Sequence, residues 1–306
     1  MDVLAQTLPF FALIGLGWGA GKRGMFDAAA TAALTAFVFY FALSALLFRF
    51  TAGLDLGAVL NGPFILAYVS ATALVYLIAT GVALWRGQGM AVTAVEAQCA
   101  VIGNVGFLGI PMLGQLLGPG AVGPIITVLS IDLIVFGSLI VVLIVLDRGQ
   151  GGVGRLAATV GSGLLRNPMI VSIALGLSVA AAGIELPGPA DRFLEILGAA
   201  ATPGALFAIG ASLATKSAER LSVAGWLSVC KLVLHPGAVA VTAFVIFDVE
   251  PFAAGVMLAA AALPVAGNVF ILAQSYGVAP QRASAAILVS TALSVATVTA
   301  VLALLV

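Results

Sequence analysis

Residues 97–118 read AQCAVIGNVGFLGIPMLGQLLG, an uncharged apolar run that contains several glycines and one proline. Pro111 lacks an N–H and clashes with the carbonyl four residues back, and the glycines up to Gly109 weaken the helix just before it. Asn104 can hydrogen-bond backbone groups that an interruption releases. Lipid offers such groups no partner, so the interruption has to be buried in protein or line a polar cavity. The stretch therefore predicts a broken membrane helix.

A second run has the same design. Residues 253–277 read AAGVMLAAAALPVAGNVFILAQSYG, in which Asn268 follows Pro264. When Gly118 is aligned with Gly277, the window 104–111 falls on 263–270, so the two breaks correspond. Paired breaks of this kind indicate a transporter's binding site, because the half-helix after each break directs a partly positive N-terminus at the midplane, where it attracts anions. The alternative is that each proline makes an ordinary packing kink, as is common in membrane helices.

The composition places both runs in a membrane protein. Of the 306 residues, 62% are hydrophobic and 8% are charged, whereas a soluble domain carries about 25% charged residues. This excludes a soluble enzyme, a disordered chain and a nucleic-acid binder with a basic face. We expect an all-α polytopic protein embedded in the lipid bilayer, with ten transmembrane helices. The predicted spans are 3–21, 29–48, 61–85, 92–117, 120–146, 167–184, 190–213, 220–247, 251–277 and 281–305.

Lys and Arg residues in the loops set the predicted orientation. Nine follow odd-numbered spans and two lie on the other side: Lys22, Arg23, Arg86, Arg148, Arg155, Arg166, Lys216, Arg220 and Arg282, against Arg49 and Arg192. We therefore expect a cell (inner) membrane protein with both termini outside, and no secretory signal peptide. The widest cytoplasmic loop, 147–166, separates a five-helix repeat at 1–146 from a second at 167–306. An odd number of spans per half inverts the second repeat.

Two charges are expected near the membrane midplane. Asp132 lies roughly 18 Å from the outer end of span five, and Lys231 roughly 16 Å from the inner end of span eight. A lone charge there costs about 3 kcal/mol on insertion scales, so we expect the two to be neighbours or to share a polar cavity. Lys231 would balance a carboxylate substrate, or Asp132 would take a proton or Na⁺. The alternative is a purely structural buried pair.

Two more ionisable residues are candidates for charge or ion coupling. Glu96, one turn into span four, is either a solvated residue at the mouth or a proton-exchanging group with Gln98. His235 is either a packed neutral histidine or a proton relay. The two cysteines and the single histidine fit neither a disulfide framework nor a metal site. We expect no cofactor, and H⁺ and Na⁺ remain open as coupling ions.

Five segments resemble the auxin efflux carrier family, which includes the plant PIN-FORMED carriers and bacterial organic-acid permeases. The segments are NVGFLGIPML (104–113), RNP (166–168) with Gly176, GASL (210–213), KLVLHP (231–236), and ALP (262–264) with Phe270 and Ala273. The long central cytoplasmic loop of the larger plant carriers is missing, so the short form resembles prokaryotic members.

The resemblance implies two inverted repeats whose spans four and nine cross at their breaks. It also implies a scaffold of spans 1, 2, 6 and 7, a moving transport unit, a homodimer, and a small carboxylate substrate such as malate, malonate or auxin. We expect a secondary active transporter of a small organic anion that works by alternating access. Its expected substrate site is Asn104, Gly109, Pro111, Pro264 and Asn268, with the two amides as donors.

The alternatives to a carrier are a channel, a membrane sensor and an intramembrane enzyme. A channel for the same ligands would need no conformational cycle. A non-transporting membrane sensor of these ligands is the other alternative, and the sequence shows no signalling domain that would favour it. An intramembrane hydrolase would need a nucleophile with a base or two aspartates, and Asp132 is the only aspartate predicted near the midplane.

Overall fold

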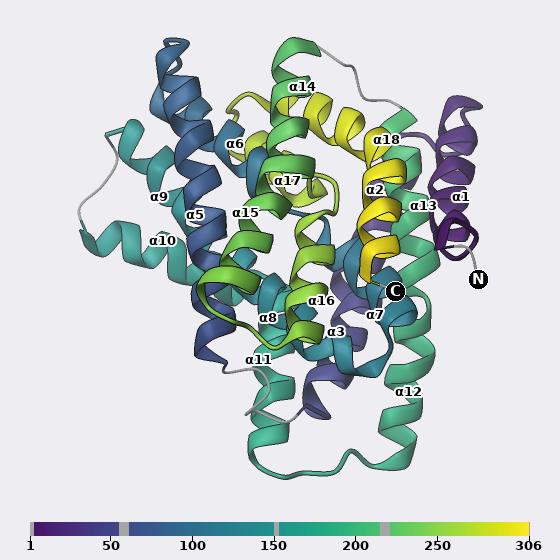
Figure 1. Cartoon of the computed structure of the whole chain (residues 1–306). Helices are drawn as coiled ribbons and strands as arrows, with labels where there is room; N and C mark the ends of the chain where they lie inside the picture. Colours follow the sequence, from purple (N-terminus) through teal and green to yellow (C-terminus); the bar gives the residue numbers. More distant parts are fainter. Residues whose placement is uncertain (1–2, 55–60, 150–152, 215–220, 306) are drawn as a thin grey trace. The chain divides into compact units, whose positions relative to one another are not determined.

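The computed structural model describes residues 3–54, 61–149, 153–214 and 221–305 (Figure 1). Throughout these ranges the secondary structure is helical, and the β-type pairing found there is a single isolated antiparallel bridge between Gly103 and Val265. The all-α prediction is therefore confirmed for the described part of the chain. Lys216 and Arg220, used above to predict the orientation, lie outside it.

The helices follow the apolar runs of the sequence. In chain order the α-helices are α1 (Val3–Lys22), α2 (Ala28–Phe37), α3 (Leu43–Ala52), α5 (Gly62–Trp85), α6 (Met90–Val101), α7 (Ile110–Leu117), α8 (Val122–Ile131), α9 (Gly137–Asp147), α10 (Val153–Arg166), α11 (Pro168–Ala181), α12 (Gly188–Ala199), α13 (Ala201–Ala214), α14 (Leu221–Val229), α15 (His235–Val241), α16 (Pro251–Ala261), α17 (Gly267–Ser275) and α18 (Pro280–Leu305). Wider π-helical turns join or precede several of them: η1 (Val38–Ala42), η2 (Val105–Gly109), η4 (Asp132–Phe136), η5 (Cys230–Leu234) and η6 (Thr242–Ile246). A 3₁₀ turn, η3 (Pro119–Ala121), precedes α8.

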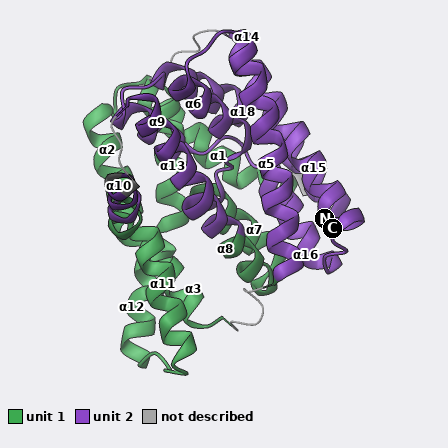
Figure 2. Cartoon of the chain, turned by 90° about the vertical axis from the view of Figure 1, so that its left-hand side faces the viewer, with its two compact units in different colours: residues 1–61, 106–127, 163–215 green, residues 62–105, 128–162, 216–306 purple. Residues whose placement is uncertain are grey.

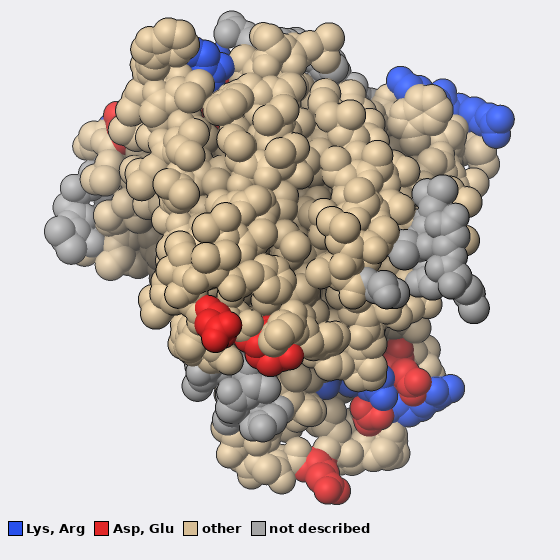
Figure 3. Space-filling model, viewed as in Figure 1, with Lys and Arg blue, Asp and Glu red and all other residues tan. Residues whose placement is uncertain are grey.

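Several helical stretches are long and apolar enough to cross a membrane. Six qualify among the described residues: Ala28–Ala52, Gly62–Trp85, Pro119–Asp147, Gly188–Ala214, Leu221–Ile246 and Pro280–Leu305. A bent pair, Leu156–Arg166 with Pro168–Ala181, turns by 73° and would make a seventh. The face of the molecule in Figure 3 carries few charged side chains, as expected of a surface in contact with lipid. The count of ten spans and their inverted repeat remain predictions.

The chain forms two compact units (Figure 2). Unit 1 comprises residues 1–61, 106–127 and 163–215, and unit 2 comprises 62–105, 128–162 and 216–306. The units interleave along the sequence, so each draws on both predicted repeats. The division of the chain into 1–146, 147–166 and 167–306 is a statement about repeats and stays a prediction.

Unit 1 is held together by close helix packing. Helix α1 lies along α13, and a Cβ added to Gly17 would come within 3.0 Å of the Phe207 Cα atom. Helix α3 lies along α11 and also contacts α12. Arg49 on α3 forms a two-point ion pair with Asp191 on α12, with Nε–Oδ1 and Nη2–Oδ2 distances of 2.6 and 3.0 Å. Small residues thus let helix backbones approach where larger side chains would separate them.

Unit 2 contains two helices that stop inside it. Helix α6 ends at Val101 and α16 ends at Ala261, and both last residues are fully buried. Helices α5 and α18 both contact α6, and α18 also contacts α16 and α17. The interrupted helices are therefore surrounded by protein, as the lack of backbone partners in lipid requires.

Candidate functional site

The two interruptions in unit 2 pair with each other through their backbones. The Asn104 N–H donates to the Pro264 carbonyl at 2.8 Å, and the Ala266 N–H donates to the Ile102 carbonyl at 3.0 Å. These two bonds flank the isolated bridge described above. Backbone groups released by one broken helix therefore find hydrogen-bond partners in the other. The pairing avoids the free-energy cost of burying these groups without partners.

Side chains complete the pairing. The Val265 N–H donates to the Ser290 hydroxyl of α18 at 3.0 Å, so this amide is satisfied as well. A Cβ on Gly103 would lie 3.1 Å from the Ala260 carbonyl oxygen and 3.3 Å from Cε of Lys231. Glycine at this position leaves the room in which the lysine stem and the end of α16 meet.

The first break begins earlier than its proline suggests. The α-helix stops at Val101, the π-helical turn η2 follows, and Pro111 lies in the first turn of α7. Proline is tolerated there because the first N–H groups of a helix have no intrahelical acceptor. Pro111 therefore starts a helix, whereas Pro264 lies inside its break. Gly109 and Pro111 belong to unit 1, whereas the paired segments belong to unit 2.

The two predicted amides lie at or beside the paired segments. Asn104 is 5% exposed. Asn268 is the second residue of α17, and its buried Oδ1 atom has no hydrogen-bond partner among the described residues. An amide with an unmet hydrogen-bonding group at the start of a helix is placed to bind a polar guest.

Asp132 is held by a residue that the sequence analysis missed. The Tyr68 hydroxyl donates to Oδ1 of Asp132 at 2.8 Å, and both side chains are buried. The second carboxylate oxygen, Oδ2, has no partner among the described residues. Asp132 and Lys231 lie near enough for their charges to interact, and the expectation that they are neighbours or share a polar cavity stays a prediction.

Lys231 closes the end of a broken helix. Its fully buried ammonium donates to the carbonyl of Ala261, the last residue of α16, and lies 3.2 Å from Nδ1 of His235. The C-terminal end of a helix carries a partial negative charge that a cation stabilises. His235 is also buried, and its Nε2 lies 3.0 Å from the Thr72 hydroxyl. The histidine is thus packed into a hydrogen-bonded chain.

A pattern in the sequence could have revealed both missed partners. Tyr68 and Thr72 are four residues apart on α5, so they share one helix face. A polar pair at this spacing inside an apolar helix indicates a face turned to other polar groups. Asp132 and Lys231 themselves lie in the π-helical turns η4 and η5. Such turns are frequent at functional sites.

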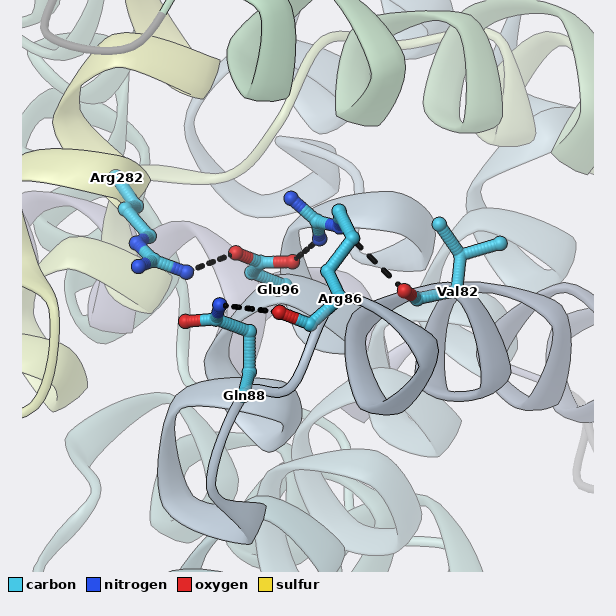
Figure 4. A network of polar contacts seen from close by, with 5 residues as sticks. All are labelled: Val82, Arg86, Gln88, Glu96 and Arg282. Carbon is cyan, nitrogen blue, oxygen red and sulfur yellow. Dashed lines mark hydrogen bonds and ion pairs between the residues drawn. The ribbon is translucent and has the colours of Figure 1, made fainter.

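Glu96 differs from its expectation as a solvated residue at the mouth. Its side chain is fully buried, and its two carboxylate oxygens accept from different arginines, Arg86 and Arg282 (Figure 4). The interpretation as a solvated residue is therefore wrong, because the side chain has no contact with solvent. The two arginines replace the water that the carboxylate loses on burial. Gln98 is not the partner found, and its buried Oε1 lacks a partner in the described ranges. Within the same ranges, no group of three or more His, Cys, Asp or Glu is arranged to hold a metal ion.

Apolar helices, paired interruptions and buried charges define a multi-pass membrane protein of the transporter class. The chain belongs to the auxin efflux carrier family, since the family model described as "Membrane transport protein" matches residues 2–302. It is also 31% identical over 310 residues to a Rhizobium meliloti (strain 1021) protein named "Putative malonate transporter", covering 99% of this chain and 96% of that protein. The family and the relative's name indicate a transporter and not an enzyme.

Proposed function

We propose that the protein is a secondary active transporter of a small dicarboxylate, with malonate as the first candidate, and that it works by alternating access. The observation that carries the proposal is the backbone pairing of two interrupted helices inside unit 2. Interrupted spans that meet near the membrane midplane form the substrate sites of many secondary transporters. The substrate class is supported by the relative's name and by the family.

The proposed site lies where the pairing ends and α17 begins. Asn268 has an unpartnered amide oxygen there, and an amide turned by 180° presents its NH₂ group at that point. Together with the partly positive N-terminus of α17, this group would bind one carboxylate. Asn104, on the opposing segment, is the second proposed donor. Pro264 would shape the site without donating, and the roles predicted for Gly109 and Pro111 of unit 1 stay predictions.

Charge balance is assigned to the buried ionisable groups. Lys231 supplies a fixed positive charge behind the paired segments, where it caps α16. Asp132 is the proposed coupling group, because its free Oδ2 atom can take a proton or help to hold Na⁺. Uptake measured with imposed pH and Na⁺ gradients distinguishes these ions, and uptake that responds to neither removes Asp132 from the coupling role.

Transport by purified protein in proteoliposomes tests the proposal. Labelled malonate should enter faster when unlabelled malonate is inside, because a carrier exchanges its substrate and a channel does not. Asn104→Leu and Asn268→Leu should abolish this exchange and leave the thermal midpoint and elution volume nearly unchanged. Gln274→Leu removes an exposed amide from the same helix as Asn268 and should transport normally. Full exchange by both asparagine variants would contradict the site.

The remaining expectations concern assembly and orientation. We propose a homodimer in the inner membrane with both termini outside, on the basis of the family and the loop charges. Light scattering of the detergent-solubilised protein gives the oligomeric state. Labelling of single cysteines placed at each terminus, by a reagent that does not cross the membrane, gives the orientation.

A further inference from the structure

We propose that α18 is a brace that sets the two interrupted helices in register, with Arg282 and Ser290 as positioning residues for the substrate site. The importance of that site for transport rests on the proposed function above. The brace itself rests on contacts within unit 2. Arg282 contacts the first interrupted helix, and Ser290 contacts the second interruption.

The first contact runs through Glu96. This carboxylate lies on α6, about one and a half turns before the helix stops. It is fully buried, and one of its oxygens accepts from Arg282 in the first turn of α18 (Figure 4). A buried carboxylate cannot leave its cations without a large desolvation cost. Movement of α6 along its own axis would pull Glu96 away from Arg282, so the arginine fixes where α6 ends.

The second contact is made two turns further along α18. Ser290 is eight residues after Arg282, about 12 Å along the helix, and its hydroxyl accepts from the Val265 N–H at 3.0 Å. The hydroxyl also donates to the Ile287 carbonyl at 3.3 Å, so its oxygen is turned to the break by a bond to its own helix. The serine therefore fixes the position of the second break along the axis of α18.

One rigid helix thus holds both pieces. The two backbone bonds between residues 102–104 and 264–266 have good geometry only when the end of α6 and the second break lie at matching positions along α18. Asn104 belongs to one segment, and Asn268 begins the helix after the other. The distance from Arg282 to Ser290 along α18 therefore sets how the two proposed donors face a carboxylate.

Arg86 provides a matched control for the arginine. It donates to the other oxygen of Glu96, from the residue after α5, so this bond joins α6 to the end of α5 and not to α18. Arg282→Gln and Arg86→Gln remove the same charge from the same carboxylate, and only the first removes the ion pair between α6 and α18. Arg282→Gln should raise the KM for malonate about tenfold with Vmax little changed, whereas Arg86→Gln should change KM less than about threefold. Arg282→Lys keeps one charged donor and should restore most of the affinity.

Ser294 provides the control for the serine. It is also fully buried on α18, one turn further on, and its hydroxyl donates only to the Thr291 carbonyl among the contacts of the described residues. Ser290→Ala should speed hydrogen exchange in peptides covering residues 264–267 about tenfold, because the Val265 amide loses its acceptor. Ser294→Ala should leave exchange there unchanged.

Hydrogen exchange separates this inference from the proposed function, because it needs no substrate. If wild-type protein binds no carboxylate, the function is wrong, and exchange over 102–105 and 264–267 still tests the brace. Faster exchange in both segments for Arg282→Gln, but not for Arg86→Gln, supports it. Equal exchange within each matched pair overturns it. The serine pair decides alone if Arg282→Gln fails to fold.

Discussion

The two units differ in what they bury. Among the described residues of unit 1, the buried polar side chains are all threonines: Thr7, Thr31, Thr51 and Thr127. In the described part of unit 2, the buried polar side chains include a lysine, a histidine, two carboxylates and two amides: Lys231, His235, Glu96, Asp132, Gln98 and Asn104. The unit 1 ion pair between Arg49 and Asp191 stays partly in solvent, with side chains 30% and 39% exposed.

The difference shows two ways of burying polar atoms in an apolar protein. Thr51 and Thr127 donate to carbonyls of their own helices, at 2.8 and 3.0 Å, so unit 1 needs no polar contact between helices at these points. In unit 2 the buried ionisable groups find partners on other helices, as with Tyr68 and Asp132, although buried serines such as Ser228 and Ser294 donate to carbonyls of their own helices. Such networks stabilise only when their members are present together. The stability of unit 2 should therefore fall most when a buried charge is removed. The stability of unit 1 should fall most when a larger side chain is placed between closely packed helices.

Removal of the unit 2 cation should have the largest effect. Lys231→Met leaves the Ala261 carbonyl without its donor and Asp132 without its neighbouring positive charge. A buried charge deprived of its partner costs about 3–5 kcal/mol, so the thermal midpoint in detergent should fall strongly. Lys22→Met, at an exposed position in unit 1, should change stability by less than about 0.5 kcal/mol. Equal midpoints for the two variants would show that the buried network contributes nothing.

A methyl group added in unit 1 should have the next largest effect. In Gly17→Ala the new Cβ would lie 2.9 Å from the carbonyl carbon of Phe207, and backbone on both sides prevents easy relief. We expect a loss of about 1–3 kcal/mol. Gly15→Ala places the same group on the same helix with nothing within 4 Å. That variant should be stabilised by up to about 1 kcal/mol, because alanine favours the helix. Thermal midpoints of the same sign would contradict the packing of α1 on α13.

The exposed ion pair should give the smallest effect. Arg49→Gln removes a partly solvated two-point contact, which is worth about 0–1 kcal/mol. Since salt screens such pairs, the midpoint difference between wild type and variant should shrink further when the ionic strength is raised. A loss comparable to that of Lys231→Met would mean that charge matters equally in both units.

The sequence was sufficient to predict the elements whose causes are local. Proline, glycine and asparagine placed both interruptions within a few residues, because backbone chemistry decides where a helix stops. The position of the first break was shifted, since Pro111 is tolerated at a helix start and Gly103 is required at the closest approach. Long apolar runs predicted the helices for the same local reason.

Contacts between distant residues could not be predicted in this way. Glu96 reads as a residue at a helix end, and its burial depends on Arg282, which is 186 positions away. Tyr68 and Asp132 are joined by tertiary packing that no local rule specifies. The π-helical turns at Asp132 and Lys231 contain no proline or glycine themselves, although Gly137 and Pro236 follow them within two residues.

The antiparallel bridge between the broken helices constrains the number of residues in the two paired segments. Successive side chains of an extended segment point to opposite faces, so inserting or deleting one residue in 102–104 or 264–266 would turn every following side chain of that segment over. Asn104 would then face away from its present neighbours, although the composition would hardly change. Variation in length among related chains should therefore be confined to the connecting loops.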